Sequence, residues 1–248
     1  MANSDQLAVL AQGAEAWNEW RKQHELEKPD LAEEDLSKWN LSDCNLKFAN
    51  LRGADLRETK FWFTQLVGAD LSYSDLRNAV VVYSDFQDAN LSNSCAENIV
   101  LLDCNLTGVD FRYCDLFDAI FTRSIIDGAR FEGSSFGHSI FADVDLSTAF
   151  GLEQCDHHWH PSTIGIDTIV KSGGKIPHLF LRETGIPDRI IDYIGSLVEN
   201  PIQYYSCFIS YSSMNQEFAK RLYADLQNNN VRCWLATEDM KIGDRFRA

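Results

Sequence analysis

Long apolar runs are missing from this chain. No stretch reaches the roughly 18 to 20 consecutive apolar residues that a membrane-spanning helix needs. The first residues also lack the basic start and the apolar run that are typical of a secretory signal peptide. From these absences we expect a soluble, cytoplasmic protein that is neither exported nor held in a membrane.

Basic residues are scarce as well. The 248 residues include 22 Lys and Arg against 37 Asp and Glu, so the formal net charge is −15. A protein that binds nucleic acid directly needs a basic surface to neutralise phosphates. The composition therefore argues against direct nucleic-acid binding and favours an acidic, well solvated surface.

An apolar residue recurs at every fifth position from Leu31 to Leu146, and of these residues only Ala96 is small. An α-helix requires apolar spacings of three and four, and a strand requires a spacing of two, so a period of five fits neither element. A single phase held over about 115 residues indicates a repeat array instead. The column is Leu31, Leu36, Leu41, Leu46, Leu51, Leu56, Phe61, Leu66, Leu71, Leu76, Val81, Phe86, Leu91, Ala96, Leu101, Leu106, Phe111, Leu116, Phe121, Ile126, Phe131, Phe136, Phe141 and Leu146.

A second column, two places before the first, contains mostly small or β-branched residues such as Ala49, Ala54 and Thr59. The place between the two columns is often Asp or Asn, and glycine recurs two places after the large residue. We infer a chain that turns every five residues, with the large and small columns pointing inward. Gly and Asx suit the corners, because Gly tolerates a positive φ and Asx side chains bond nearby backbone.

This pattern resembles the pentapeptide repeat family. The resemblance implies a right-handed, four-sided β-helix with four pentapeptides per coil. About 23 units then make five to six coils, and the ~4.8 Å strand spacing gives a rod roughly 25–30 Å tall. Some members of the family imitate duplex DNA and engage a topoisomerase, so an acidic DNA mimic is an alternative function. Arginines such as Arg52 and Arg130 interrupt that acidic surface.

The seven cysteines are odd in number. Cys44, Cys104 and Cys114 fall in the small inward column, where a thiol behaves as a small hydrophobic group. This placement favours a reducing cytoplasm over a disulfide framework.

Helices are expected on both sides of the repeats. Residues 4–24 predict one amphipathic helix, capped by Asn3 or Ser4, that closes the first coil within an N-terminal cap spanning residues 1–30. After the β-helix of residues 31–150, residues 151–203 predict a helical linker. Its helices are expected at 164–170, ending at Gly173, after Pro177, and after Pro187.

One cluster of Cys and His residues in this linker is a candidate metal site. Cys155, His157, His158 and His160 are the candidate ligands. As zinc ligands they are poorly arranged, because they crowd into one short segment without a second pair at a separate site. We therefore expect a polar turn packed on the last coil, and we assign no metal.

Residues 204–248 have apolar spacings typical of strands and a helix in place of the five-residue period. An apolar run at 206–212, helical spacing of Phe218, Leu222 and Leu226, and a second run at 231–235 predict strand, helix and strand. That alternation implies a parallel βαβ unit. A loop from Glu238 to Arg245 follows.

The segments "CFISYS", "EFAKRLYADLQ", "VRCWLATED" and "MKIGDRFR" closely resemble the start of a Toll/interleukin-1 receptor (TIR) domain. Bacterial TIR domains often cleave the glycosidic bond of NAD and are activated by assembly, and the architecture resembles that of bacterial, cyanobacterial-type proteins. By this resemblance the nucleotide cleft or assembly loop would involve Ser210, Tyr211, Ser212, Trp234, Glu238 and Gly243.

The resemblance covers about 45 residues, and the catalytic Glu of the family lies on a later helix. Since the sequence stops at Ala248, we expect a truncated TIR domain that is loosely packed, swapped with another chain or docked on the linker. We predict no NAD hydrolysis by this chain, no cofactor and no catalytic residue; NAD hydrolysis is the alternative for a longer parent protein.

The predicted fold class is therefore mainly β: a right-handed quadrilateral β-helix with an N-terminal helical cap, a helical linker and a partial α/β segment. The predicted function is a cytoplasmic scaffold that carries or clusters a TIR signalling segment. Its partners would be proteins, including a homo-oligomer formed through the rod or the TIR part, rather than nucleic acid or membrane.

Overall fold

The computed structural model describes residues 3–157, 161–199, 206–209, 215–228 and 232–235. The chain divides into two compact units, Met1–Gly195 and Ser196–Ala248. No helix among the described residues is long and apolar enough to cross a membrane.

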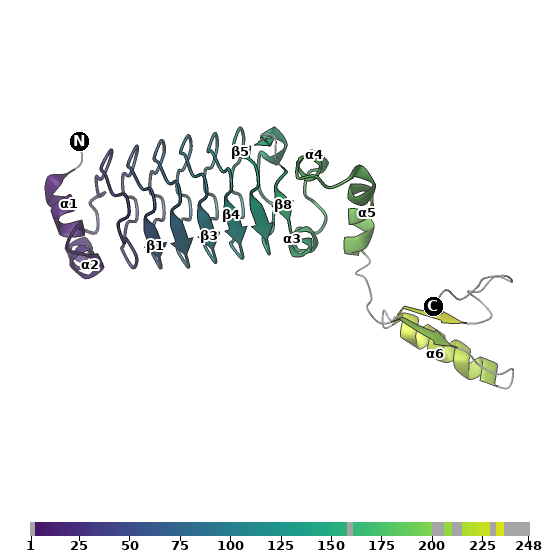
Figure 1. The fold of residues 1–248 in the computed structure, drawn as a ribbon. Coiled ribbons are helices and arrows are strands. Elements are labelled where there is room, and N and C mark those ends of the chain that lie inside the picture. The colour runs from purple at the N-terminus through teal and green to yellow at the C-terminus, as the bar shows by residue number, and fades with distance from the viewer. Residues whose placement is uncertain (1–2, 158–160, 200–205, 210–214, 229–231, 236–248) are drawn as a thin grey trace. The chain divides into compact units, whose positions relative to one another are not determined.

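The first unit is built around a β-solenoid, confirming the predicted fold class (Figure 1). Its main sheet is parallel, with the strand order β1-β2-β3-β4-β6-β8. The strands are β1 Lys60–Trp62, β2 Val80–Val82, β3 Val100–Leu102, β4 Ile120–Thr122, β6 Ile140–Ala142 and β8 Thr163–Ile164. Each of the strands β1 to β4 pairs with the residues 20 positions further on, for example Val81 with Leu101. Four pentapeptides therefore complete one coil.

The same register holds on the other sides of the rod. Isolated parallel bridges join Asp35 to Asp55 and Asp55 to Asp75. The Leu36 N–H donates to the Asp55 carbonyl oxygen at 2.9 Å, and the Leu56 N–H donates to that of Asp75 at 2.7 Å. The large apolar column is consequently stacked inside the coil, where its members are buried.

The Asp and Asn column has a clear structural reason. Asp35 Oδ1 accepts a hydrogen bond from the Ser37 N–H at 3.0 Å, and Asp70 Oδ1 accepts one from the Ser72 N–H at 3.0 Å. These Asx turns open the corners, and the next residue adopts a left-handed backbone, as at Lys38 with φ 64°. Because the Asx bond supports the corner, many non-glycine residues occupy this conformation, which glycine alone adopts without strain.

The N-terminal segment contains two helices rather than the single helix predicted over residues 4–24. They are α1 Ser4–Leu10 and α2 Ala14–Gln23, separated at Gly13, whose φ of 101° interrupts the helix. Asn3 caps α1, and its side chain accepts from the N–H groups of Asp5 and Gln6. The indole of Trp17 is fully buried and donates to the Asn45 carbonyl oxygen at 2.9 Å, which fastens α2 to the rod.

At the other end, strand pairing continues beyond the regular repeats. β7 Asp156–His157 pairs with β5 Ser135–Phe136, and β8 pairs with β6. Compared with the regular spacing of 20 residues, the coil is one residue longer between β5 and β7 and three residues longer between β6 and β8. Ile164, expected in a helix, therefore lies in a strand. A short 3-10 helix, η1 Leu152–Gln154, lies in the irregular coil.

Where the strands stop, side-chain hydroxyl groups accept hydrogen bonds from backbone N–H groups of the last coil. In α3 Ile166–Lys171, Thr168 Oγ1 accepts from the Val144 N–H at 3.3 Å. The hydroxyl of Ser172, just after α3, accepts from the Leu146 N–H at 2.9 Å. Two further helices begin after the predicted prolines, α4 His178–Glu183 and α5 Asp188–Glu199.

The second unit contains the predicted βαβ unit. β9 Ser206–Ile209 and β10 Arg232–Leu235 are parallel, with Cys207 opposite Cys233, and α6 Gln216–Asn228 connects them. Ala219 of α6 is buried, whereas Phe218 is 66% exposed.

Candidate functional site

The interior of the rod is filled with side chains. Phe121 stacks on Phe141 with ring centroids 5.1 Å apart and meets Phe111 edge to face at 5.8 Å. Both the large and the small columns are buried along the coils. Groups that could bind a partner must therefore be sought on the outer surface.

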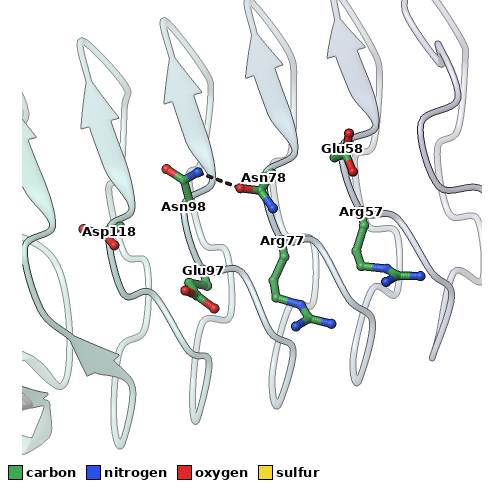
Figure 2. Close-up of a pocket in the computed structure, with 7 residues that line it drawn as sticks. All are labelled: Arg57, Glu58, Arg77, Asn78, Glu97, Asn98 and Asp118. Carbon is green, nitrogen blue, oxygen red and sulfur yellow. Dashed lines mark hydrogen bonds between the residues drawn. The ribbon is translucent and has the colours of Figure 1, made fainter.

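One polar groove of about 430 Å³ follows a corner of the rod. Figure 2 shows the side chains in order along successive coils, with Arg57 and Glu58 at one end and Asp118 at the other. Its lining residues are Arg57, Glu58, Arg77, Asn78, Glu97, Asn98 and Asp118. Asn98 Nδ2 donates to Asn78 Oδ1 at 2.6 Å, which joins two neighbouring coils across the groove.

The two arginines of the groove are already engaged by carboxylates. Arg77 donates to both carboxylate oxygens of Asp75, at 2.9 Å and 2.5 Å, and Arg57 binds Asp55 in the same way. These hydrogen bonds lower the pKa values of Asp55 and Asp75 and raise those of Arg57 and Arg77. The groove is therefore suited to hydrogen-bonded contact with a polar partner, but its arginines are not free cationic sites.

Cys155 and His157, two of the candidate metal ligands, line a different pocket. The Cys155 thiol lies 3.5 Å from Ser134 Oγ and 3.3 Å from the Phe131 carbonyl oxygen, and burial raises its pKa to about 12. The His157 ring packs between Phe136 and Phe180, with centroids 5.6 Å and 5.0 Å away. Desolvation lowers the pKa of this imidazole.

This environment is one of packing rather than of ligation. Among the described residues no group of three His, Cys, Asp or Glu side chains could hold a metal ion. The other two candidates, His158 and His160, lie outside the described residues.

Of the predicted TIR site residues, the structure places one. Trp234 lies in β10, in register with Phe208 of β9. The remaining candidates, Ser210, Tyr211, Ser212, Glu238 and Gly243, lie outside the described residues, so their roles stay predictions.

The 20-residue register and the repeated corner agree with a comparison against known protein families. Three overlapping or adjoining segments, 35–72, 44–80 and 84–123, match the family model described as "Pentapeptide repeats (8 copies)". The matched segments of the rod are pentapeptide repeats. Residues 207–248 of the chain match the model described as "TIR domain", which agrees with the resemblance found from the sequence.

Solved pentapeptide repeat proteins are similar to this chain at low identity. Full-length QnrB1, a plasmid-mediated fluoroquinolone resistance protein, is 16% identical over 63% of this chain and 97% of its own, with a TM-score of 0.30. Rfr23 from the cyanobacterium Cyanothece 51142 is 21% identical over 47% of this chain and 94% of its own, with a TM-score of 0.25. None of the curated proteins matches the chain significantly.

The sequence reasoning missed one surface feature, the apolar outer side of the main sheet. Its signal was present as "KFW", "VVV", "VLL", "IFT" and "IFA" at 20-residue intervals, where apolar residues flank the inward one on both sides.

Proposed function

We propose that this chain is a non-catalytic scaffold whose rod carries a TIR segment into protein assemblies. The observation that carries the proposal is the filled interior of the solenoid, which leaves only outward-facing groups for function. Each coil repeats these groups at ~4.8 Å intervals, which suits a rigid interaction surface. The TIR match supplies the signalling character.

The exposed side of α6 is the surface through which the C-terminal unit would make contacts. Phe218 is 66% exposed and Leu222, one turn later, is 37% exposed. Side chains four residues apart share a helix face, so the two form an apolar patch. Such a patch on a polar helix is suited to binding another protein.

The direct test uses the full chain and a purified, complete bacterial TIR domain as the probe. We expect measurable binding that falls at least about tenfold, or about 1.4 kcal/mol, in Phe218→Asp. Gln216→Asp, at an exposed position of the same helix, adds the same charge and is expected to bind as the unmodified chain does. Equal binding by both variants would contradict the proposal.

Incubation with NAD tests the enzymatic alternative. The scaffold proposal predicts no nicotinamide above a protein-free blank, because the catalytic Glu implied by the TIR resemblance has no counterpart among the matched motifs. Release of nicotinamide by the purified chain would favour an NAD hydrolase instead.

The DNA-mimic alternative needs an uninterrupted acidic stripe along one side of the rod. In the ladder that includes Asp35, Asp55 and Asp75, two carboxylates are paired with arginines and the next position is Cys95. This partial neutralisation does not favour the alternative. Inhibition of gyrase supercoiling by the purified chain would support it.

A further inference from the structure

The outer side of the main sheet is apolar along the rod. The central residue of each strand points inward, so its two neighbours face outward. These neighbours include Val80, Val82, Val100, Leu102, Ile120 and Ile140, which are half-buried except for Ile140, at 37% exposed. In a chain of net charge −15, the outward positions of β1, β2, β3, β4 and β6 carry one charged residue, Lys60. We call these outward positions the sheet face.

Two exposed aromatic side chains widen the sheet face at one edge. Phe63 and Tyr83 directly follow β1 and β2, stack with ring centroids 5.3 Å apart, and are 56% and 55% exposed. Contiguous apolar surface of this kind marks an interaction site on a soluble protein.

We propose that the sheet face binds the sheet face of a second copy of this chain. Two copies of a strongly acidic protein repel each other, and this repulsion is smallest where the surface has little charge. Side-chain rows on the sheet face repeat at the ~4.8 Å spacing of the coils. A second copy has the same spacing, so its rows can lie directly opposite these rows along the whole contact. This inference does not depend on what the C-terminal unit does.

Side-chain size favours an arrangement in which the two rods run antiparallel to each other. A two-fold axis along the strands, through the row of Val100 and Leu102, places the row of β1 against the row of β6 of the other copy. The large Trp62 then lies opposite the small Ala142, and Lys60 lies opposite Ile140. In a parallel arrangement the β1 rows of both copies would meet, which would bring Trp62 and Lys60 of each copy to the same level.

The size of the contact sets the expected affinity. Five rows at ~4.8 Å make a face about 20–25 Å long, and its narrow width leaves the buried area below the roughly 1,200 Å² of stable complexes. We therefore expect a dissociation constant on the order of tens of micromolar.

Sedimentation velocity of the full chain, from about 5 to about 500 µM, spans that constant. The unmodified chain is expected to shift from monomer to dimer. Leu102→Lys places like charges opposite each other at the two-fold axis and should weaken the dimer at least tenfold, or about 1.4 kcal/mol. Ser92→Lys adds the same charge at a half-buried outward position outside the main sheet and should dimerise normally.

A size swap tests the arrangement itself. Ala142→Trp alone should weaken the dimer, because two tryptophans would then meet, and adding Trp62→Ala should restore it. Thr122→Lys replaces Leu102→Lys if the latter does not fold. A chain that stays monomeric throughout, or a Leu102→Lys variant that dimerises normally, would overturn the proposal. Failure of the double variant to recover would overturn the antiparallel pairing.

Discussion

The rod and the C-terminal unit, Ser196–Ala248, differ in how fully their strand edges and apolar side chains are covered. In the rod, each coil covers the strand edges and apolar side chains of the one before it, and helices or hydroxyl groups finish both ends. In the C-terminal unit, one helix packs with two strands, and Phe218 remains 66% exposed. The difference shows that a repeat stabilises itself by adding equal layers, whereas a parallel sheet needs helices on both of its faces.

Hydrogen exchange should reveal the largest difference between the two regions. Amides that donate to the next coil, such as Leu76 N–H to the Cys95 carbonyl oxygen at 2.7 Å, lie over a buried core. We expect their exchange free energies to exceed those of β9, α6 and β10 by about 4 kcal/mol or more. Equal protection in the two regions, measured by mass spectrometry on the full chain, would remove the basis of the comparison.

Removing one core aromatic should have the next largest effect. Phe121 is fully buried and contacts Phe111, Phe131 and Phe141. Phe121→Ala leaves a cavity and should lower the free energy of unfolding of the rod by about 3–5 kcal/mol. Urea denaturation followed by circular dichroism measures this loss.

The matched control for that variant is Tyr113→Ala. Tyr113 is 66% exposed, so its removal should cost much less than the loss of the buried Phe121 ring. A similar loss in both variants would mean that the rod is not stabilised mainly by its stacked interior.

Much of the rod could be predicted from the sequence because filling the interior constrains every fifth residue. Leu56, Leu76 and Leu116 are buried as expected, and Trp17 closes the first coils. The prediction of one continuous helix over residues 4–24 was wrong. The apolar spacing continues across Gly13, but the backbone turns at that residue.

Outward features were harder to predict, because contact with water places few demands on residue type. The polar groove depends on which side chains align after 20 residues, as Asn78 and Asn98 do, and this requires the coil register. The apolar sheet face was visible in the sequence only as triplets such as "VVV", which read equally well as buried strand. Of the predicted TIR residues, the structure describes the backbone position of Trp234 alone.

Glycine corners allow a smaller, local test of the rod. Gly68 has a φ of 63°, and a Cβ there would lie 2.7 Å from Cδ1 of Phe48, whereas a Cβ on Gly128, with a φ of 67°, would meet nothing within 4 Å. Gly128→Ala should therefore cost about 1–2 kcal/mol from backbone strain alone. Gly68→Ala should cost more by the amount needed to displace the Phe48 ring. Thermal and urea denaturation of both variants measure the difference, and equal losses would show that the ring moves without cost.

The ion pairs on the rod surface should give the smallest effect. Hydrogen bonding to Arg77 lowers the pKa of Asp75 in the folded chain, so this carboxylate stabilises the fold above its unfolded pKa, about 3.9. The contribution is lost as pH falls through the lower, folded pKa. Solvent screening limits it to about 0.2–1 kcal/mol. Asp75→Asn should therefore reduce stability at pH 7 and flatten its decline below about pH 4, as measured by urea denaturation across pH. If the acid dependence of stability does not change, the Asp75–Arg77 pair is no stronger in the folded chain than in the unfolded chain. The stacked interior would then be the main reason why the rod is more stable than the C-terminal unit.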